Sequence, residues 1–120
     1  MGELSAPSIE ALVPKARERA SPYLEFVRTA AMSVGVYVLP ADGVDRQSPH
    51  AEDELYCVVR GRGRFRNGED EGPVRPGDVL YVPARRAHRF VAIEEELVLL
   101  VAFAPPESDG RSPASPDAPR

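Results

Sequence analysis

The sequence predicts an all-β fold, a sandwich or barrel of short strands, preceded by a short helical segment. From residue 23 onward, short apolar runs alternate with segments of Gly, Pro and Asp, which is the spacing of many strands joined by turns. No helical stretch separates these runs, so a parallel sheet with crossover helices is not expected. With 120 residues, the chain is long enough for one domain with a buried core but too short for two.

The N-terminal segment, residues 1–22, is expected to be helical or extended and to precede the barrel. Ser8 is a suitable N-cap for residues 9–12, and the residues that follow are mostly good helix formers. Pro14 lacks the backbone N–H that a continuous helix requires, so we expect only one or two short turns. Pro22 then ends the segment.

Residues 23–104 are expected to form the barrel. Seven apolar runs have the composition of strands, at residues 24–29, 32–39, 55–59, 63–66, 79–82, 89–93 and 97–103. The runs at 55–59 and 97–103 are apolar on both faces, whereas one face of a strand in a lone barrel meets water. Either the N-terminal segment or a second copy of the chain therefore covers the outer face. A homodimer that packs sheet against sheet explains the pattern best.

The last segment, residues 105–120, has a different composition. It is rich in Pro, Ser, Asp and Gly and has almost no apolar side chains. Such a segment cannot offset the entropy of ordering by burial, so a disordered tail is predicted.

Composition also excludes several classes of function. The formal net charge of −4 argues against a nucleic-acid partner, which requires a basic face. A single cysteine cannot form an intramolecular disulfide, and no stretch approaches the length of a membrane span. The first thirty residues lack the pattern of a signal peptide. A cytoplasmic protein with no nucleic-acid or membrane partner is therefore predicted.

The only two histidines, His50 and His88, lie within two distinctive motifs. In the first, three residues separate His50 from Glu54, and six residues separate Glu54 from Gly61. In the second, Gly77 is followed after five residues by Pro83 and then by His88. These segments resemble the two motifs of the cupin superfamily. The resemblance implies a double-stranded β-helix, or jelly-roll barrel.

The resemblance also implies a metal site. The usual ligands of the family are three histidines and a glutamate, of which this chain has His50, Glu54 and His88. Ser48 stands where the first histidine is expected, and because it shares strand parity with His50, its hydroxyl or a water that it positions is expected near the fourth position. Arg85 and Ala92 replace a glycine and an asparagine of the second motif. Two imidazoles and one carboxylate suit one divalent Fe, Mn, Ni or Zn ion, whose identity stays open, and a vestigial, metal-free site is the alternative.

Three further residues are candidates for contact with a small-molecule substrate. Tyr56 follows Glu54 by two residues and therefore shares its face of the strand. Arg85 lies in a loop that the family places at the barrel mouth, where it can pair with a carboxylate or simply solvate the loop. Phe90 is expected to line or support the cavity. Cys57 follows Tyr56 directly, so it lies on the opposite face of the strand and is expected to point away from the site.

Three functions stay open at this point. The first is a metal-dependent enzyme that acts on a small organic molecule, with oxygenation ahead of isomerisation or lyase chemistry. The second is a non-catalytic domain that binds or senses a small molecule. The third is a metal-free barrel whose motif residues are remnants. The fold alone does not separate them, because one fold hosts many functions.

Overall fold

The computed structural model describes residues 6–19, 22–47 and 49–108. Within these residues the chain forms a helix and six strands: α1 (Ile9–Arg17), β1 (Tyr23–Arg28), β2 (Ser33–Leu39), β3 (Asp53–Asn67), β4 (Asp70–Val74), β5 (Val79–Val82) and β6 (His88–Ala104). The predicted all-β fold with a short N-terminal helical segment is confirmed.

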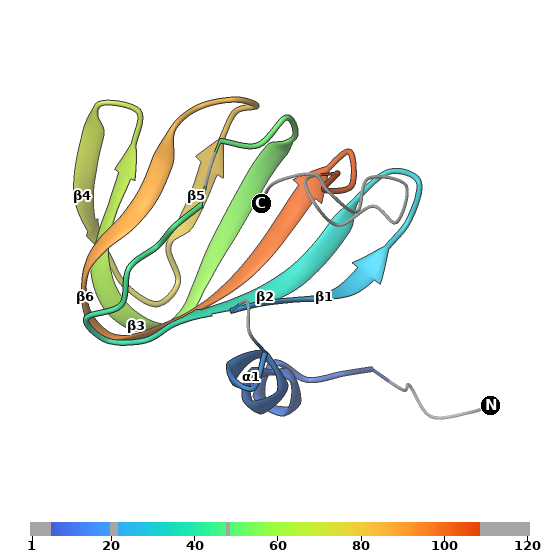
Figure 1. The fold of residues 1–120 in the computed structure, drawn as a ribbon, viewed down its shortest axis with the longest axis horizontal. Coiled ribbons are helices and arrows are strands. Elements are labelled where there is room, and N and C mark those ends of the chain that lie inside the picture. Colours follow the sequence, from blue (N-terminus) through green and yellow to red (C-terminus); the bar gives the residue numbers. More distant parts are fainter. Residues whose placement is uncertain (1–5, 20–21, 48, 109–120) are drawn as a thin grey trace.

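One antiparallel sheet contains all six strands. Its order is β1-β2-β6-β3-β4, and β5 pairs with β3 outside this path. The strands curve around a common interior, and α1 lies on the outside of the curved sheet (Figure 1). The central strand is β6, which pairs with both β2 and β3. The interior of this curved sheet is where the candidate site lies.

Four of the predicted strands merge into two long, bent strands in the structure. The runs at 55–59 and 63–66 both belong to β3, and the runs at 89–93 and 97–103 both belong to β6. Between them the pairing of β3 with β6 shifts register three times, and such bulges let a strand bend without ending. Gly61 has a φ of 101°, and a Cβ there would lie 2.0 Å from the carbonyl oxygen of Glu96. Glycine is therefore required at the bend, although in the sequence it resembles a break.

Two elements differ from the prediction. The edge strand β4 was not expected, because its Asp, Glu, Gly and Pro residues are typical of turns, but an edge strand tolerates both proline and charge. The helix α1 runs without interruption through Pro14. It is stabilised by burial of Leu12, Val13 and Ala16, and Ser8 caps its N-terminus as predicted.

The interior of the curved sheet is apolar along most of its length. Its largest fully buried apolar side chains are Tyr56, Phe90, Leu39, Ile93, Leu97 and Leu99. Phe90 packs against both Tyr56 and Phe65, with ring centroids 5.0 and 4.5 Å apart. The packed aromatic side chains form a firm wall next to the candidate site.

A second apolar cluster lies on the outer face of the sheet. Leu12, Val13 and Ala16 of α1 pack there with Val36, Val38 and Val98. The N-terminal segment thus covers part of this face, which is one of the two alternatives that the sequence left open. Leu55, Val79 and Tyr81 remain 45, 62 and 55% exposed on β3 and β5. The predicted homodimer stays a prediction.

Two residues of the predicted tail, Glu107 and Ser108, contact the barrel. Glu107 is only 1% exposed, and its backbone N–H donates to Ser33 Oγ at 2.8 Å. Arg28 donates to its carbonyl oxygen at 2.7 Å. Residues 109–120 lie outside the described residues. In the described parts of the chain, no helix is long and apolar enough to cross a membrane.

Candidate metal centre

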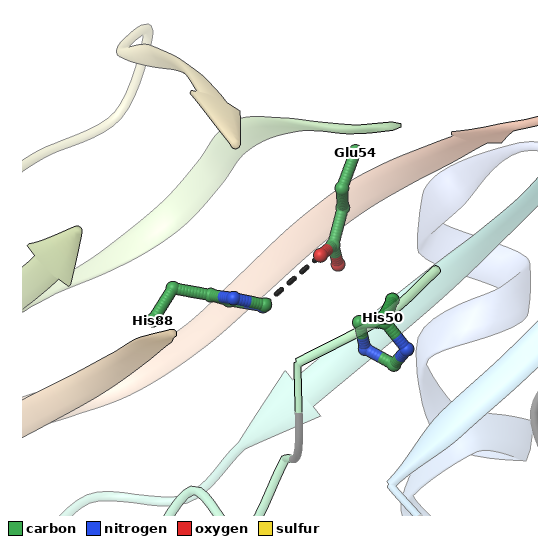
Figure 2. Close-up of side chains that lie close together, drawn as sticks. All are labelled: His50, Glu54 and His88. Atoms are coloured by element: carbon green, nitrogen blue, oxygen red, sulfur yellow. Dashed lines mark ion pairs between the residues drawn. The ribbon is translucent and has the colours of Figure 1, made fainter. Parts of the chain in front are cut away.

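The structure brings together three of the predicted site residues from separate parts of the chain. His50 lies in the loop after β2, Glu54 near the start of β3 and His88 at the first residue of β6. Their candidate ligand atoms lie within 4.8 Å of one another, and the residues are 7, 2 and 6% exposed. Figure 2 shows both imidazole rings and the carboxylate converging on one point. Glu54 pairs with Val82 of β5, six residues before His88, so the short link from β5 to β6 brings these two residues together.

The facing atoms of this cluster lack hydrogen bonds. Glu54 Oε1 lies 3.0 Å from His88 Nε2, but neither oxygen of Glu54 forms a well-aligned hydrogen bond within the described residues, and neither does His88 Nε2. Buried polar atoms without partners are rare and costly in folded proteins. Two imidazole nitrogens and a carboxylate are ligands of transition metals, so the residues present fit a bound divalent ion.

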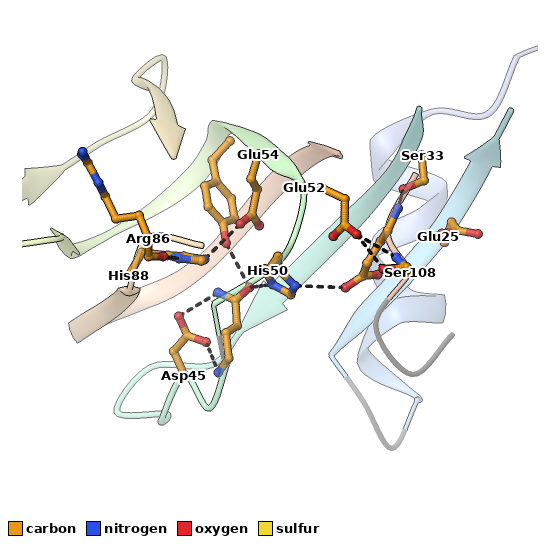
Figure 3. Close-up of polar contacts among 12 residues, drawn as sticks. Glu25, Ser33, Asp45, His50, Glu52, Glu54, Arg86, His88 and Ser108 are labelled. Atoms are coloured by element: carbon orange, nitrogen blue, oxygen red, sulfur yellow. Dashed lines mark hydrogen bonds and ion pairs between the residues drawn. The ribbon is translucent and has the colours of Figure 1, made fainter. Parts of the chain in front are cut away.

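The two histidines differ at the other ring nitrogen. His88 Nδ1 lies at hydrogen-bond distance, 2.9 Å, from the carbonyl oxygen of Arg86, whereas His50 Nδ1 lies 3.6 Å from Glu107 Oε2, too far for a hydrogen bond. An acceptor at Nδ1 favours a proton there and leaves the lone pair on Nε2. Figure 3 shows these contacts extending on both sides of Glu54. Metal-binding histidines are commonly held in this way.

The charge state of His88 depends on opposing effects. Burial lowers the pKa of its imidazole, because a charged ring is poorly solvated there, but the Glu54 carboxylate 3.0 Å away outweighs this effect. The pKa of His88 is therefore raised above its usual value of 6.5. In the absence of a metal, the proton serves as the positive partner of the buried carboxylate.

Asp45 holds the loop that carries His50, a role that the sequence did not reveal. It is 1% exposed and accepts hydrogen bonds from the Tyr37 hydroxyl at 2.8 Å and the Phe90 backbone N–H at 2.9 Å. Gln47 donates to it from both its backbone and its side chain, at 3.2 and 3.0 Å. The pKa of Tyr37 is raised, first by burial and then by the adjacent Asp45. Neither Asp45 nor Gln47 stands at a defined residue position of the cupin motifs, so the sequence did not identify them as site residues.

The predicted substrate-contacting residues lie in different settings. The Tyr56 hydroxyl donates to Gln47 Oε1 at 3.0 Å beside the site, and burial followed by the charge of Glu54 raises its pKa, so the phenol keeps its proton. Phe90 is buried in the aromatic wall. Arg85 is exposed, and its backbone N–H donates to the His50 carbonyl at 2.6 Å. Ser48, the predicted fourth position, lies outside the described residues.

The arginine row of β3 lies on the outside and is paired with carboxylates. Its ion pairs join Arg60 with Glu10, Arg62 with Glu94 and Glu95, and both Arg64 and Arg66 with Glu71. These contacts are exposed and contribute little each, as expected for a solvated strand face. Cys57 is half-buried and out of phase with the inward-facing Glu54 and Tyr56, as its position in the strand predicted.

Comparisons with known proteins agree with this fold. The sequence profile of the cupin domain matches residues 35–103, and the chain therefore belongs to the cupin family. An uncharacterized protein of Streptomyces coelicolor is 51% identical over 86 residues, which cover 72% of this chain and 82% of that protein. The predicted cupin resemblance and jelly-roll barrel are confirmed.

Solved structures extend the likeness at low sequence identity. KdgF from a Halomonas species is 20% identical with a TM-score of 0.66, over 73% of this chain and 84% of that one. A protein from Neisseria meningitidis is 16% identical with a TM-score of 0.66, over 83 and 99% of the two chains. The DMSP lyase DddQ from Ruegeria pomeroyi is 19% identical with a TM-score of 0.59, over 75% of this chain but 46% of that one. At these identities the likeness establishes the fold alone.

Proposed function

We propose that this cupin binds one divalent transition metal through His50, Glu54 and His88 and presents it to a small organic molecule. The observation that carries the proposal is the convergence of three buried ligand groups, of which the facing atoms of Glu54 and His88 lack well-aligned hydrogen bonds. Two histidines and one carboxylate leave coordination positions open, an arrangement used by oxygen-activating iron proteins. When bound, the ion would supply Lewis-acid or oxygen-activating chemistry.

The residues around the site support a role in small-molecule binding. The Tyr56 hydroxyl, kept protonated by burial and by Glu54, lies beside the cluster and donates to Gln47 Oε1, so it adds a polar group to the wall of the site. Phe103 contacts the His50 ring at a centroid distance of 5.0 Å and excludes water from that side. An oxygenase-like enzyme is therefore the first specific candidate, ahead of isomerase or lyase chemistry.

Binding without turnover is the second candidate. Rings of Tyr56 and Phe65 lie 6.0 and 6.2 Å from the His88 ring, and Phe90 packs against both. This filled interior favours a small ligand or the ion alone over a bulky substrate. A sensor or carrier needs no more room than that.

Metal content of the purified protein, expressed without a histidine tag, tests the proposal. We expect close to one equivalent of Fe, Mn, Ni or Zn in the wild type and almost none in His50→Ala or Glu54→Gln. Glu52→Gln is the matched control, since Glu52 is also buried, lies two residues from Glu54 and instead binds Ser108 at 2.7 Å. Equal metal loss in Glu52→Gln, or a wild type that binds none of the four ions, would contradict the proposal.

The identity of the ion then separates the two candidates. Iron together with oxygen consumption in the presence of small carbonyl or phenol compounds is expected for the oxygenase-like enzyme. A tightly bound ion with no turnover of any such compound, but with ligand-dependent thermal stabilisation, is expected for the binding domain.

A further inference from the structure

We infer that the side-chain oxygen of Gln47 is a fourth protein ligand of the ion. Gln47 stands at none of the ligand positions of the two cupin motifs. At position 48, where the family has its first histidine, this chain has serine. The inference rests on the proposed metal binding and adds to it a residue from the loop between β2 and β3.

The orientation of the Gln47 amide is determined by Asp45. The amide nitrogen donates to Asp45 Oδ2 at 3.0 Å, and a carboxylate can only accept hydrogen bonds. Asp45 is itself held by Tyr37 and by the backbone N–H of Phe90. The amide therefore cannot rotate by half a turn without placing its oxygen against the carboxylate, and Oε1 must point away from Asp45.

This orientation directs Gln47 Oε1 toward the candidate metal centre. The oxygen lies 3.0 Å from the Tyr56 hydroxyl and 3.4 Å from His50 Nε2. A carbonyl oxygen has two lone pairs, of which the Tyr56 hydroxyl uses one. The second lone pair is available on the side of His50.

The spacing of Gln47 Oε1 from His50 Nε2 is also that of two ligands of one ion. At 3.4 Å the two atoms are at the long end of hydrogen-bonding distance, so the contact is weak as a hydrogen bond. A cation held by the lone pairs of both atoms accounts for the same spacing. Two ligands each about 2.1 Å from one ion lie about 3.0 to 3.4 Å apart. Both close contacts of this site, His50 with Gln47 and His88 with Glu54, fall in that range, at 3.4 and 3.0 Å.

A ligand set of two imidazoles, one carboxylate and one amide oxygen has a predictable preference. Oxygen ligands suit harder ions such as Mn(II), whereas a third imidazole favours Zn and other ions with an affinity for nitrogen. With Gln47 in place of a histidine, this site should prefer zinc over manganese less strongly than a site of three histidines and a glutamate does.

Gln47 is the only glutamine in the sequence, which allows a direct test in the wild-type protein. With glutamine labelled at the side-chain carbonyl carbon, a single resonance reports on Gln47. We expect this resonance to move during titration with Zn(II) and to stop moving at one equivalent. An unchanged resonance at saturation would overturn the inference.

Affinity measurements on variants provide the second test, with Mn(II) in competition with a chromophoric chelator. Gln47→Leu, which preserves volume but removes the oxygen, should weaken Mn(II) binding about tenfold or more. Ser48→Ala should bind within about twofold of the wild type, and thermal unfolding of each apo variant checks its folding. The inference is wrong if Gln47→Leu is folded and binds as tightly as wild type, or if Ser48→Ala has the larger loss. A wild type that binds no metal would overturn the proposed function as well. Failure of the proposed function is thereby distinguished from failure of the Gln47 inference alone.

Discussion

The two faces of the central strands β2 and β6 contrast in what they bury. On the outer face, beneath α1, the cluster is entirely apolar. On the inner face, the apolar interior changes toward the His50 loop into a polar region. Seven polar or charged residues are buried in the described chain: Ser33, Asp45, His50, Glu52, Glu54, His88 and Glu107.

These buried polar groups do not contribute to stability in the same way. Asp45 accepts four hydrogen bonds and rigidifies the loop around it. Glu54 lies 3.0 Å from His88 Nε2 and has no well-aligned hydrogen bond within the described residues. A carboxylate buried in this way costs stability. The outer face therefore stabilises the protein, whereas the inner polar region includes a carboxylate that lowers its stability.

The largest expected effect on stability lies in the apolar interior. Leu97 is fully buried on β6, so Leu97→Ala should lower the free energy of unfolding by about 3 kcal/mol through lost burial and a residual cavity. Urea unfolding of the apo protein measures this change. Val79→Ala, at a position 62% exposed, is the control and should differ little from wild type. A small effect at Leu97 would mean that the interior is loosely packed.

The second-largest loss of stability is expected in the outer apolar cluster. Leu12→Ala removes an almost buried side chain from beneath α1 and should cost about 2 kcal/mol, the low end for such changes, because the helix can partly collapse onto the sheet. Metal affinity should remain unchanged in this variant. Lys15→Ala, on the exposed side of the same helix, controls for helix propensity. Loss of metal binding in Leu12→Ala would show that the two faces are coupled.

A smaller effect, on metal affinity, is expected when Glu107, which faces His50 Nδ1, is changed. Glu107→Gln keeps the size of the side chain but removes the charge that faces Nδ1, and should weaken metal affinity about tenfold, equivalent to about 1.4 kcal/mol. Glu52→Gln, which disturbs the contact with Ser108 in the same segment, should change affinity much less. Equal effects in both variants would assign the loss to anchoring of the segment rather than to the His50 contact.

The smallest effect concerns the ion pair between Arg17 of α1 and Glu96 of β6. The hydrogen bond from Arg17 lowers the pKa of Glu96 below its usual 4.5, so the carboxylate stabilises the fold above that pH and loses its contribution as the pH falls. Glu96→Gln should lower Tm by about 2 °C or less at pH 7, since exposed pairs are weak. The difference from wild type should vanish toward pH 3. Glu69→Gln, in the exposed turn after β3, is the control for loss of a surface carboxylate that has no such ion pair in the described structure.

The motif spacing predicted the cluster of His50, Glu54 and His88, because each residue lies where strand alternation and the cupin motifs place a ligand. The residues that support the cluster were not predictable in the same way. Asp45 and Gln47 act through a loop whose path depends on contacts with β2 and β6, which no local pattern specifies. Polar side chains in a turn-rich segment are usually solvated, and here the tertiary structure buries them.

The start of the predicted tail also shows what a local pattern leaves out. Residues 105–108 have the composition of a solvated tail, but the backbone of Glu107 is held by Ser33 and Arg28, and its carboxylate faces His50. A short segment can be ordered by a few such contacts without apolar burial of its own. Likewise, the bends of β3 and β6 resembled strand ends because a bulge and a turn use similar residues.

The central position of β6 has a consequence for folding. It is the last strand in the described part of the chain, yet it lies between β2 and β3, so these two strands join one sheet only when β6 pairs with both. Isolated hairpins are too small to be stable alone. His88 begins β6, so the cluster of His50, Glu54 and His88 forms only when the sheet closes.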